Sequence, residues 1–178
     1  HGQVLVDARG RVLANTDGAS ALTAFSRDGR VVASLLPDWK GGLHGMCLDG
    51  KGGEQRVWIA HARRGEVVCC TLDGEVLSTI GWPEASALYK KRGQYHPTSV
   101  ARASDGRIFV ANGYGLSWVH VYDAERRYLK SFGGRGQEPG KMRTPHGLLI
   151  DRVAGVESLI VCDRENHRLQ ISDLDGKL

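Results

Sequence analysis

The stretch "FGGRGQEPGKMRTPHGLLID" (132–151), followed by "LIVCDRENHRLQISDLDG" (159–176), contains the pattern from which the fold is predicted. Short runs of leucine, isoleucine and valine alternate in it with polar turns rich in glycine and aspartate. Apolar runs of this length between such turns are typical of β-strands. A hairpin turn is expected at Asp175-Gly176, because both residue types tolerate the positive φ that such turns require.

The same pattern occurs in four copies, at about 1–36, 41–81, 94–132 and 144–178. Each copy has apolar runs separated by turns, and its outermost hairpin falls at Asp28-Gly29, Asp73-Gly74 or Asp175-Gly176, or at the weaker turn Glu125-Arg126. Sustained helical periodicity is missing, and only residues 83–93 suggest a short helical turn. Four-stranded units that repeat at this interval predict an all-β fold, a β-propeller whose blades pack against one another.

The segment 133–176 resembles the NHL repeat closely, and the other three copies resemble it more loosely. The likeness lies in the Gly-rich connection, the Pro-x-Gly strand start and the segment Asp-x-x-Asn-His-Arg-Leu-Gln. NHL propellers usually have six blades, so the resemblance implies that residues 1–178 are a single propeller domain with about four blades, roughly two-thirds of a ring. In this motif Asp163, Asn166 and Arg168 are expected to be structural, bonding local backbone groups.

The composition is that of a globular protein, with 41% hydrophobic and 25% charged residues. The net charge of +4 is small, so the basic cluster Lys90, Lys91 and Arg92 indicates a solvated surface more than a nucleic-acid interface. No run is long enough for a membrane helix. Because the sequence starts at His1 rather than at Met, it leaves the compartment open, with export the favoured expectation.

The four cysteines have no spacing that is typical of a zinc site. Cys47 and Cys162 lie in apolar runs and are expected to be buried thiols. The adjacent Cys69 and Cys70 should point to opposite faces of one strand, and no disulfide is predicted.

Histidines recur where the innermost strand of a copy begins. His44 and His146 occupy this position in the second and fourth copies, Thr98 in the third and, approximately, His1 in the first. The two histidines are 102 residues apart, which is two blades, or a third of a turn in a six-bladed ring. Histidines on alternate blades would converge on the axis, as in a three-imidazole metal site with one open position.

This alternation resembles peptidylglycine α-hydroxylating lyase, a propeller that cleaves peptidyl-α-hydroxyglycine to a peptide amide and glyoxylate. The likeness lies in "GLHGMCLD" (42–49), "HPTSVARA" (96–103), "ANGYG" (111–115), "TPHGLLID" (144–151) and "VCDRENHRLQ" (161–170). It implies that His44 and His146 are metal ligands and that Tyr114 is the catalytic tyrosine, which takes the proton of the substrate hydroxyl. The implied cofactor is zinc or another divalent metal, and a structural calcium ion is compatible with the resemblance.

The sequence also departs from the lyase. Asn112 stands where the lyase has Asp, Leu116 and Trp118 replace polar residues, and a third ligand histidine is absent from the sequence. Arg164 and Glu165 are expected to be exposed at their turn. The remaining candidates for lining the channel are His1, His96, Thr98 and Asn112, whereas His61 and His120 are expected at the surface or between strands and His167 is a poor ligand candidate.

Two functions from different classes follow. The first is metal-assisted lyase or hydrolase chemistry on a small polar or peptide-like substrate. The second is a non-catalytic NHL scaffold that binds protein or RNA on one propeller face. A Ser-His-Asp hydrolase and a nucleotide cofactor are not expected, since the sequence has neither a nucleophile-elbow motif nor a phosphate-binding Gly loop before a helix.

Overall fold

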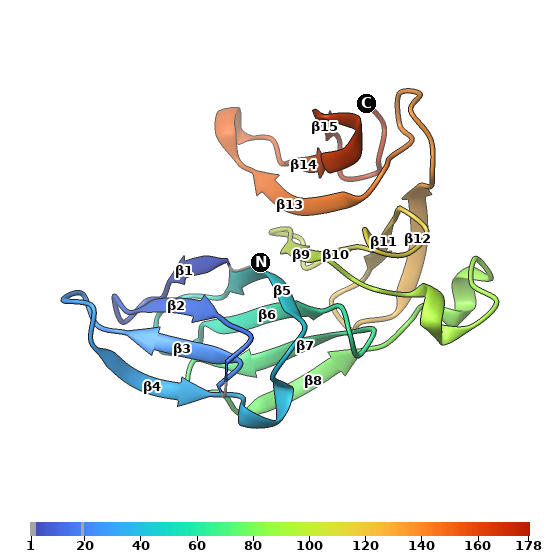
Figure 1. Ribbon diagram of the computed structural model, residues 1–178. Helices are drawn as coiled ribbons and strands as arrows, with labels where there is room; N and C mark the ends of the chain where they lie inside the picture. Colours follow the sequence, from blue (N-terminus) through green and yellow to red (C-terminus); the bar gives the residue numbers. More distant parts are fainter. Residues whose placement is uncertain (1–2, 19) are drawn as a thin grey trace.

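The computed structural model describes residues 3–18 and 20–178, whose strands form four antiparallel sheets in chain order (Figure 1). The first sheet contains β1 (Val4–Val6), β2 (Val12–Asn15), β3 (Leu22–Phe25) and β4 (Val31–Leu35). The second contains β5 (Leu43–Asp49), β6 (Arg56–His61), β7 (Glu66–Thr71) and β8 (Val76–Ile80). The third contains β9 (Ser99–Arg102), β10 (Ile108–Ala111), β11 (Trp118–Tyr122) and β12 (Tyr128–Gly133). The fourth contains β13 (Pro145–Asp151), β14 (Ser158–Asp163) and β15 (Arg168–Ser172).

Each sheet is one blade of a propeller, with its strands in sequence order from the inside outward. The innermost strands β1, β5, β9 and β13 lie next to one another, so they bring residues far apart in the sequence to a common centre (Figure 1). The predicted all-β propeller fold is confirmed.

The helical segments of the described residues are 3₁₀ turns. They are η1 (Pro37–Trp39), η2 (Gly52–Glu54), η3 (Glu84–Ser86), η4 (Arg92–Gln94), η5 (Val153–Gly155) and η6 (Arg164–Asn166). Of these, η3 lies in the connection where the sequence predicted a helical turn. Within the described part of the chain, no helix has the length and apolar character needed to span a membrane.

The outermost hairpins use the predicted turn residues. Gly29, Gly74 and Gly176 have φ of 82°, 87° and 85°, in the left-handed region that glycine reaches without steric cost. In the third blade the same position is held by Arg126 at φ 69°, which is less favourable for a residue with a Cβ atom. Its amide nevertheless bonds the Asp123 carbonyl, as the turn geometry requires.

The hydrophobic core lies between neighbouring blades. Strand β10 shows why: Ile108 and Val110 belong to the apolar cluster shared with the second blade, and Phe109 belongs to the cluster shared with the fourth. Successive side chains of a strand point to opposite faces, so a blade that is covered on both sides needs apolar residues at every position. All four residues of β10 are buried accordingly.

The same alternation places the cysteines. Cys69 and Cys70 are buried in the clusters on opposite sides of the second blade, as predicted, and Cys47 is half-buried. The prediction for Cys162 is wrong, because this thiol is exposed. It points to the face of β14 opposite Val161, away from the third blade, on the side where Leu169 is 64% exposed. All four cysteines are free.

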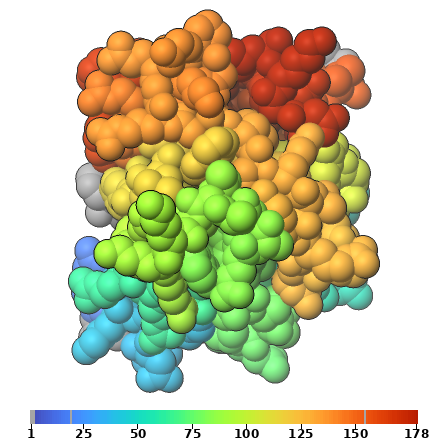
Figure 2. Space-filling model, turned by 90° about the vertical axis from the view of Figure 1, so that its right-hand side faces the viewer, coloured from blue at the N-terminus to red at the C-terminus, as the bar shows by residue number. Residues whose placement is uncertain are grey.

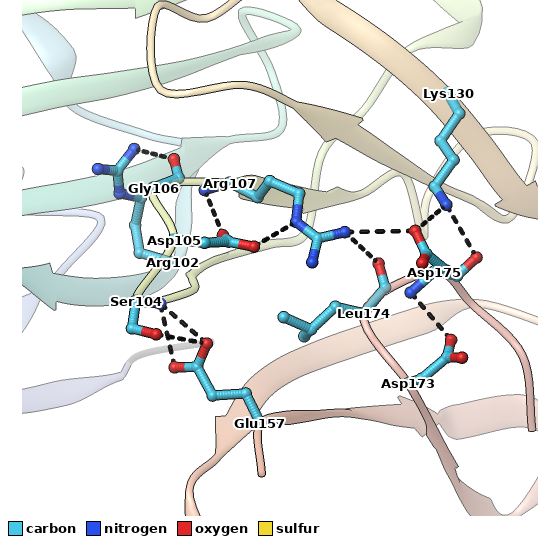
Figure 3. Close-up of polar contacts among 10 residues, drawn as sticks. All are labelled: Arg102, Ser104, Asp105, Gly106, Arg107, Lys130, Glu157, Asp173, Leu174 and Asp175. Atoms are coloured by element: carbon cyan, nitrogen blue, oxygen red, sulfur yellow. Dashed lines mark hydrogen bonds and ion pairs between the residues drawn. The ribbon is translucent and has the colours of Figure 1, made fainter.

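An arginine after the first hairpin of a blade binds a backbone carbonyl of the next blade, a contact that we call the clamp (Figure 3). The Arg107 guanidinium donates to the Leu174 carbonyl at 3.1 Å and to Asp175 Oδ1 at 3.3 Å, while Asp105 holds its Nε at 2.7 Å. Arg11 makes the same clamp from the first blade to the second, where it donates to the Leu72 carbonyl at 2.8 Å. Leu72 and Leu174 are 102 residues apart, the same interval as His44 and His146, so the four blades consist of two similar pairs.

Candidate active site

His44 and His146 lie at irregularities near the beginning of β5 and β13. The pairing of β5 with β6 shifts between Leu43 and Met46, and that of β13 with β14 shifts between Pro145 and Gly147. Bulges of this kind turn a side chain away from the regular sheet pattern and are common beside active sites. Both imidazoles are thereby presented at the end of an innermost strand.

Gly45 lets the second and third blades meet closely at this point. A Cβ atom here would lie 2.6 Å from Ser99 Oγ and 2.7 Å from the Thr98 carbonyl oxygen, which only glycine avoids. The Gly45 amide instead donates to that carbonyl at 2.9 Å. His44 Nδ1 lies 2.8 Å from the same oxygen. A carbonyl can only accept, so the Nδ1 proton is donated to Thr98 and the His44 Nε2 atom keeps its lone pair.

The two imidazoles converge on one phenol. Tyr114 Oη lies 3.1 Å from His44 Nε2 and 2.9 Å from His146 Nε2. The two imidazole rings are 4.6 Å apart between centroids and nearly perpendicular. These three side chains come from the second, third and fourth blades, and we refer to them as the His-Tyr-His cluster.

Tyr114 is held by glycines on both sides, in the loop between β10 and β11. A Cβ atom at Gly113 would lie 2.2 Å from the Pro145 carbonyl oxygen, and one at Gly115 would lie 2.2 Å from the Gln94 carbonyl oxygen. The loop therefore packs against the backbone of two other segments, which fixes the direction of the tyrosine between them. Tyr114 itself is 38% exposed.

Burial keeps both imidazoles neutral at pH 7. It lowers the pKa of His44, against the opposing effect of the hydrogen bond to Thr98. Burial also lowers the pKa of His146 to about 4, and electrostatic repulsion from His44, when protonated, and from Arg164 lowers it further. Neutral imidazole is the form of histidine that can bind a metal ion.

Residues of the cluster line two cavities. The first, about 340 Å³, is lined by residues of the innermost strands: Gln3, His44, Gly45, Ser99, His146, Gly147 and Leu148. The second, about 280 Å³, lies at the Tyr114 loop and is lined by Gly113, Tyr114, Gly115, Ser117, Arg135, Arg143, Thr144, Arg164 and Glu165. The second cavity is rich in cationic groups, because three arginines face one glutamate there.

Arg164 is a site residue that the sequence did not single out. Its guanidinium lies over the Tyr114 ring, with Cζ 5.7 Å from the centroid, and it forms an ion pair with Glu165 at 3.1 Å. It is exposed, as expected for its turn, but it faces the second cavity. A cation over an aromatic face is attracted to it by roughly 0.5–1 kcal/mol at an exposed position. Its turn begins directly after Asp163 of the NHL-type motif, which is the only sequence signal that would have placed it.

The other channel-lining candidates that the structure describes are buried or half-buried. Thr98 is fully buried, and its Oγ1 donates to the Pro145 carbonyl at 2.7 Å. Asn112 is also fully buried, beneath the Tyr114 loop. The His96 ring nitrogens lie 3.0 Å from the Ala62 carbonyl and 2.9 Å from the Gly93 carbonyl, so this imidazole is engaged by backbone. His1 lies outside the described residues.

The NHL-type motif residues hold the Gly-rich connection before β13. The buried Asp163 carboxylate accepts from the Arg143 amide at 2.6 Å, from Asn166 Nδ2 at 2.7 Å and from Arg168 Nε at 2.9 Å. Arg168 in turn donates to backbone carbonyls of this connection. His167 is exposed with φ 52° in the left-handed region, and it lines a third cavity together with Asn166 and Arg168.

The other histidines are buried between strands. His61 Nε2 contacts the Trp39 carbonyl at 3.1 Å, and His120 lies in an aromatic cluster of the third blade. No group of three or more His, Cys, Asp or Glu side chains that could hold a metal ion occurs among the residues described. The His-Tyr-His cluster brings two imidazoles and one phenol together, and the Thr98 carbonyl orients His44.

Comparisons with known proteins agree with this architecture. No family model matches the chain. "NHL repeat-containing protein 3" of Mus musculus is 26% identical over 185 residues, which cover 98% of this chain and 50% of that protein. The protein named "Probable peptidyl-alpha-hydroxyglycine alpha-amidating lyase" of Caenorhabditis elegans is 36% identical over 76 residues, 42% of this chain and 21% of that protein. The chain thus spans half or less of the curated relatives that it matches.

Solved structures show the same fold. Virginiamycin B lyase of Staphylococcus aureus, crystallised as a catalytically inactive variant with quinupristin, superposes with a TM-score of 0.68 at 15% identity. The match covers 98% of this chain and 52% of that protein. Together with the four-blade architecture, it identifies this chain as a β-propeller, which is similar in sequence to an NHL repeat-containing protein and, over part of its length, to an amidating lyase.

Proposed function

We propose that this propeller carries the catalytic centre of a metal-assisted lyase for a peptide-like substrate with a carboxylate group, resembling peptidyl-α-hydroxyglycine amidating lyase. The observation that carries the proposal is the convergence of His44 Nε2 and His146 Nε2 on the hydroxyl of Tyr114. A regular packing contact would not require two half-buried neutral imidazoles and a phenol at one point.

The divalent metal would be held by His44 and His146, and when bound it would lower the pKa of a coordinated hydroxyl toward 7. Tyr114 would accept the proton as its phenolate and become the phenol, and its oxygen lies within hydrogen-bond distance of both imidazoles. Removal of the proton from the substrate hydroxyl lets the C–N bond break. The leaving nitrogen takes up a proton to become the amide, and the former hydroxyl carbon becomes the aldehyde of glyoxylate, so atoms and charge balance.

Arg164 and Arg143 supply the positive charge that a carboxylate substrate needs. Both line the second cavity beside Tyr114, and Glu165 neutralises only part of their charge. The nearby Arg135 adds a further cation to the same wall. Arginine binds carboxylates through paired N–H donors, which also orients them.

Metal content and turnover together test the proposal. Purified protein is analysed for bound zinc and other divalent metals, and for glyoxylate release from a peptidyl-α-hydroxyglycine. The double variant His44→Ala, His146→Ala should lose the metal and the activity. The matched control His167→Asn removes an exposed imidazole at a position with positive φ, which asparagine tolerates, and should keep both.

Stoichiometric metal in the folded double variant would overturn the proposed site. A wild-type protein with neither metal nor glyoxylate release would overturn the lyase assignment, and would favour a scaffold that binds protein or RNA.

A further inference from the structure

A buried chain of hydrogen bonds begins two residues before Tyr114. Asn112 Nδ2 donates to the Tyr89 hydroxyl at 2.7 Å, and this hydroxyl lies 2.5 Å from His120 Nε2. His120 Nδ1 lies 2.6 Å from Ser131 Oγ. Asn112 and His120 are fully buried, and Tyr89 is nearly so. We refer to these four residues as the Asn112 relay.

The chemistry of Asn112 fixes the direction of every bond in the relay. An amide nitrogen can only donate, so the Tyr89 oxygen accepts from Asn112 and its own proton is directed to His120 Nε2. His120 must then carry its proton on Nδ1 and donate it to Ser131. Burial lowers the pKa of His120 to about 3, which agrees with this neutral form.

Asn112 also holds both ends of the loop that carries Tyr114. Its backbone N–H donates to the Trp118 carbonyl at 2.8 Å, and its backbone carbonyl accepts from the Ser117 N–H at 3.1 Å. Its Oδ1 accepts from the His96 amide at 2.6 Å. One side chain thus joins the Tyr114 loop to the connection between β8 and β9.

That connection lies at the seam between blades. It forms the green surface between the second blade below and the yellow third blade above in Figure 2. Tyr89 reaches inward from it to contact the rings of Tyr95 and His120. The relay therefore anchors the Tyr114 loop to the packed interior of the third blade rather than to solvent.

We propose that Asn112 is a positioning residue, whose side-chain amide, anchored through Tyr89 to His120, sets the Tyr114 hydroxyl between the two imidazoles. The effect on turnover rests on the proposed function, whereas the effect on Tyr114 does not. A carboxylate at this position has the same shape but no N–H, so it can donate neither to Tyr89 nor to the Gln94 carbonyl, which lies 3.2 Å from Nδ2.

The position of Tyr114 can be tested directly by ¹⁹F NMR. Protein labelled with 3-fluorotyrosine has five tyrosines, and the Tyr114 ¹⁹F resonance is the one that disappears in Tyr114→Phe. Asn112→Asp and Tyr89→Phe should each shift and broaden this resonance. Both should lower kcat for glyoxylate release by up to about 100-fold with little change in KM, since displacement of a catalytic group by about 1 Å has an effect of this size.

Tyr122→Phe is the matched control, because Tyr122 is buried in the same aromatic cluster but lies outside the relay. It should leave the Tyr114 resonance and kcat unchanged. If Asn112→Asp fails to fold, Tyr89→Phe alone tests the positioning role, because it removes one hydroxyl of the relay and keeps the aromatic ring.

A folded relay variant with the wild-type Tyr114 resonance would overturn the positioning role, whatever its activity. A shifted resonance in a protein whose wild type releases no glyoxylate would refute the proposed reaction and leave the positioning role intact.

Discussion

The Nε2 atoms of His44 and His146, 102 residues apart in the sequence, face the same hydroxyl oxygen of Tyr114. Each histidine stands at the same place in its blade pair, and each is turned there by an irregularity at the start of an innermost strand. The propeller architecture thus brings residues at repeated positions of the sequence together with Tyr114, where three blades meet.

Removal of the Tyr114 hydroxyl should abolish most turnover without loss of the metal. Tyr114→Phe keeps the ring contacts with both histidines and removes only the proton acceptor. A positioned acid or base contributes about 100- to 10,000-fold to the rate, so kcat should fall by that factor. Glyoxylate release and metal content measure the two effects, and a kcat close to wild type would show that another group accepts the proton.

Gly45→Ala should separate the second and third blades. Its Cβ would lie 2.6 Å from Ser99 Oγ, and we expect overpacking to lower the free energy of unfolding by about 1–3 kcal/mol. His44 should also lose its bond to Thr98, with weaker metal binding as the result. Gly53→Ala is the control, because a Cβ there meets nothing within 4 Å, and it should change stability by no more than about 0.5 kcal/mol. Equal stability of the two variants in urea denaturation would contradict the close approach.

Arg107→Ala should weaken the contact between the third and fourth blades. The side chain is only 25% exposed and donates to a backbone carbonyl of the next blade, so its loss should lower the free energy of unfolding by about 1–2 kcal/mol. Arg30, which is 84% exposed and pairs only with Asp28 among the described residues, should contribute about 0–0.5 kcal/mol. Thermal unfolding of both alanine variants compares them, and a larger effect at Arg30 would argue against the clamp.

Acid should destabilise the protein through His120. The pKa of this buried imidazole is about 3 in the folded state, against an ordinary value of 6.5, so the unfolded chain binds more protons between these values. The free energy of unfolding should therefore fall as the pH drops below 6.5, by at most about 1.4 kcal/mol per pH unit from this residue. His120→Gln should show a shallower slope over the same range, and identical slopes would mean that His120 protonates freely in the folded protein.

The sequence predicted those features that rest on periodicity. The strand pattern, the outer turns and the shared position of His44 and His146 all repeat along the chain, and repetition is visible without coordinates. The exposure of Cys162 was mispredicted, because an apolar run shows that a strand is buried on some face but not which face lacks a neighbour.

Contacts that depend on how separate segments pack together could not be predicted from the sequence. Thr98 orients His44 through its backbone carbonyl, which any residue type would offer. Arg164 reaches Tyr114 from a turn of another blade, and Asn112 is buried although its loop is at the surface. Neither the Thr98 carbonyl nor the burial of Asn112 leaves a signal in residue type or spacing, and Arg164 has only its place directly after Asp163.

X-ray absorption at the zinc edge of the purified protein tests the central claim most directly. We predict a shell of imidazole nitrogens at about 2.0–2.1 Å, with no sulfur at about 2.3 Å, that is lost in the His44→Ala, His146→Ala double variant. A sulfur shell, or a spectrum that the double variant leaves unchanged, would contradict it.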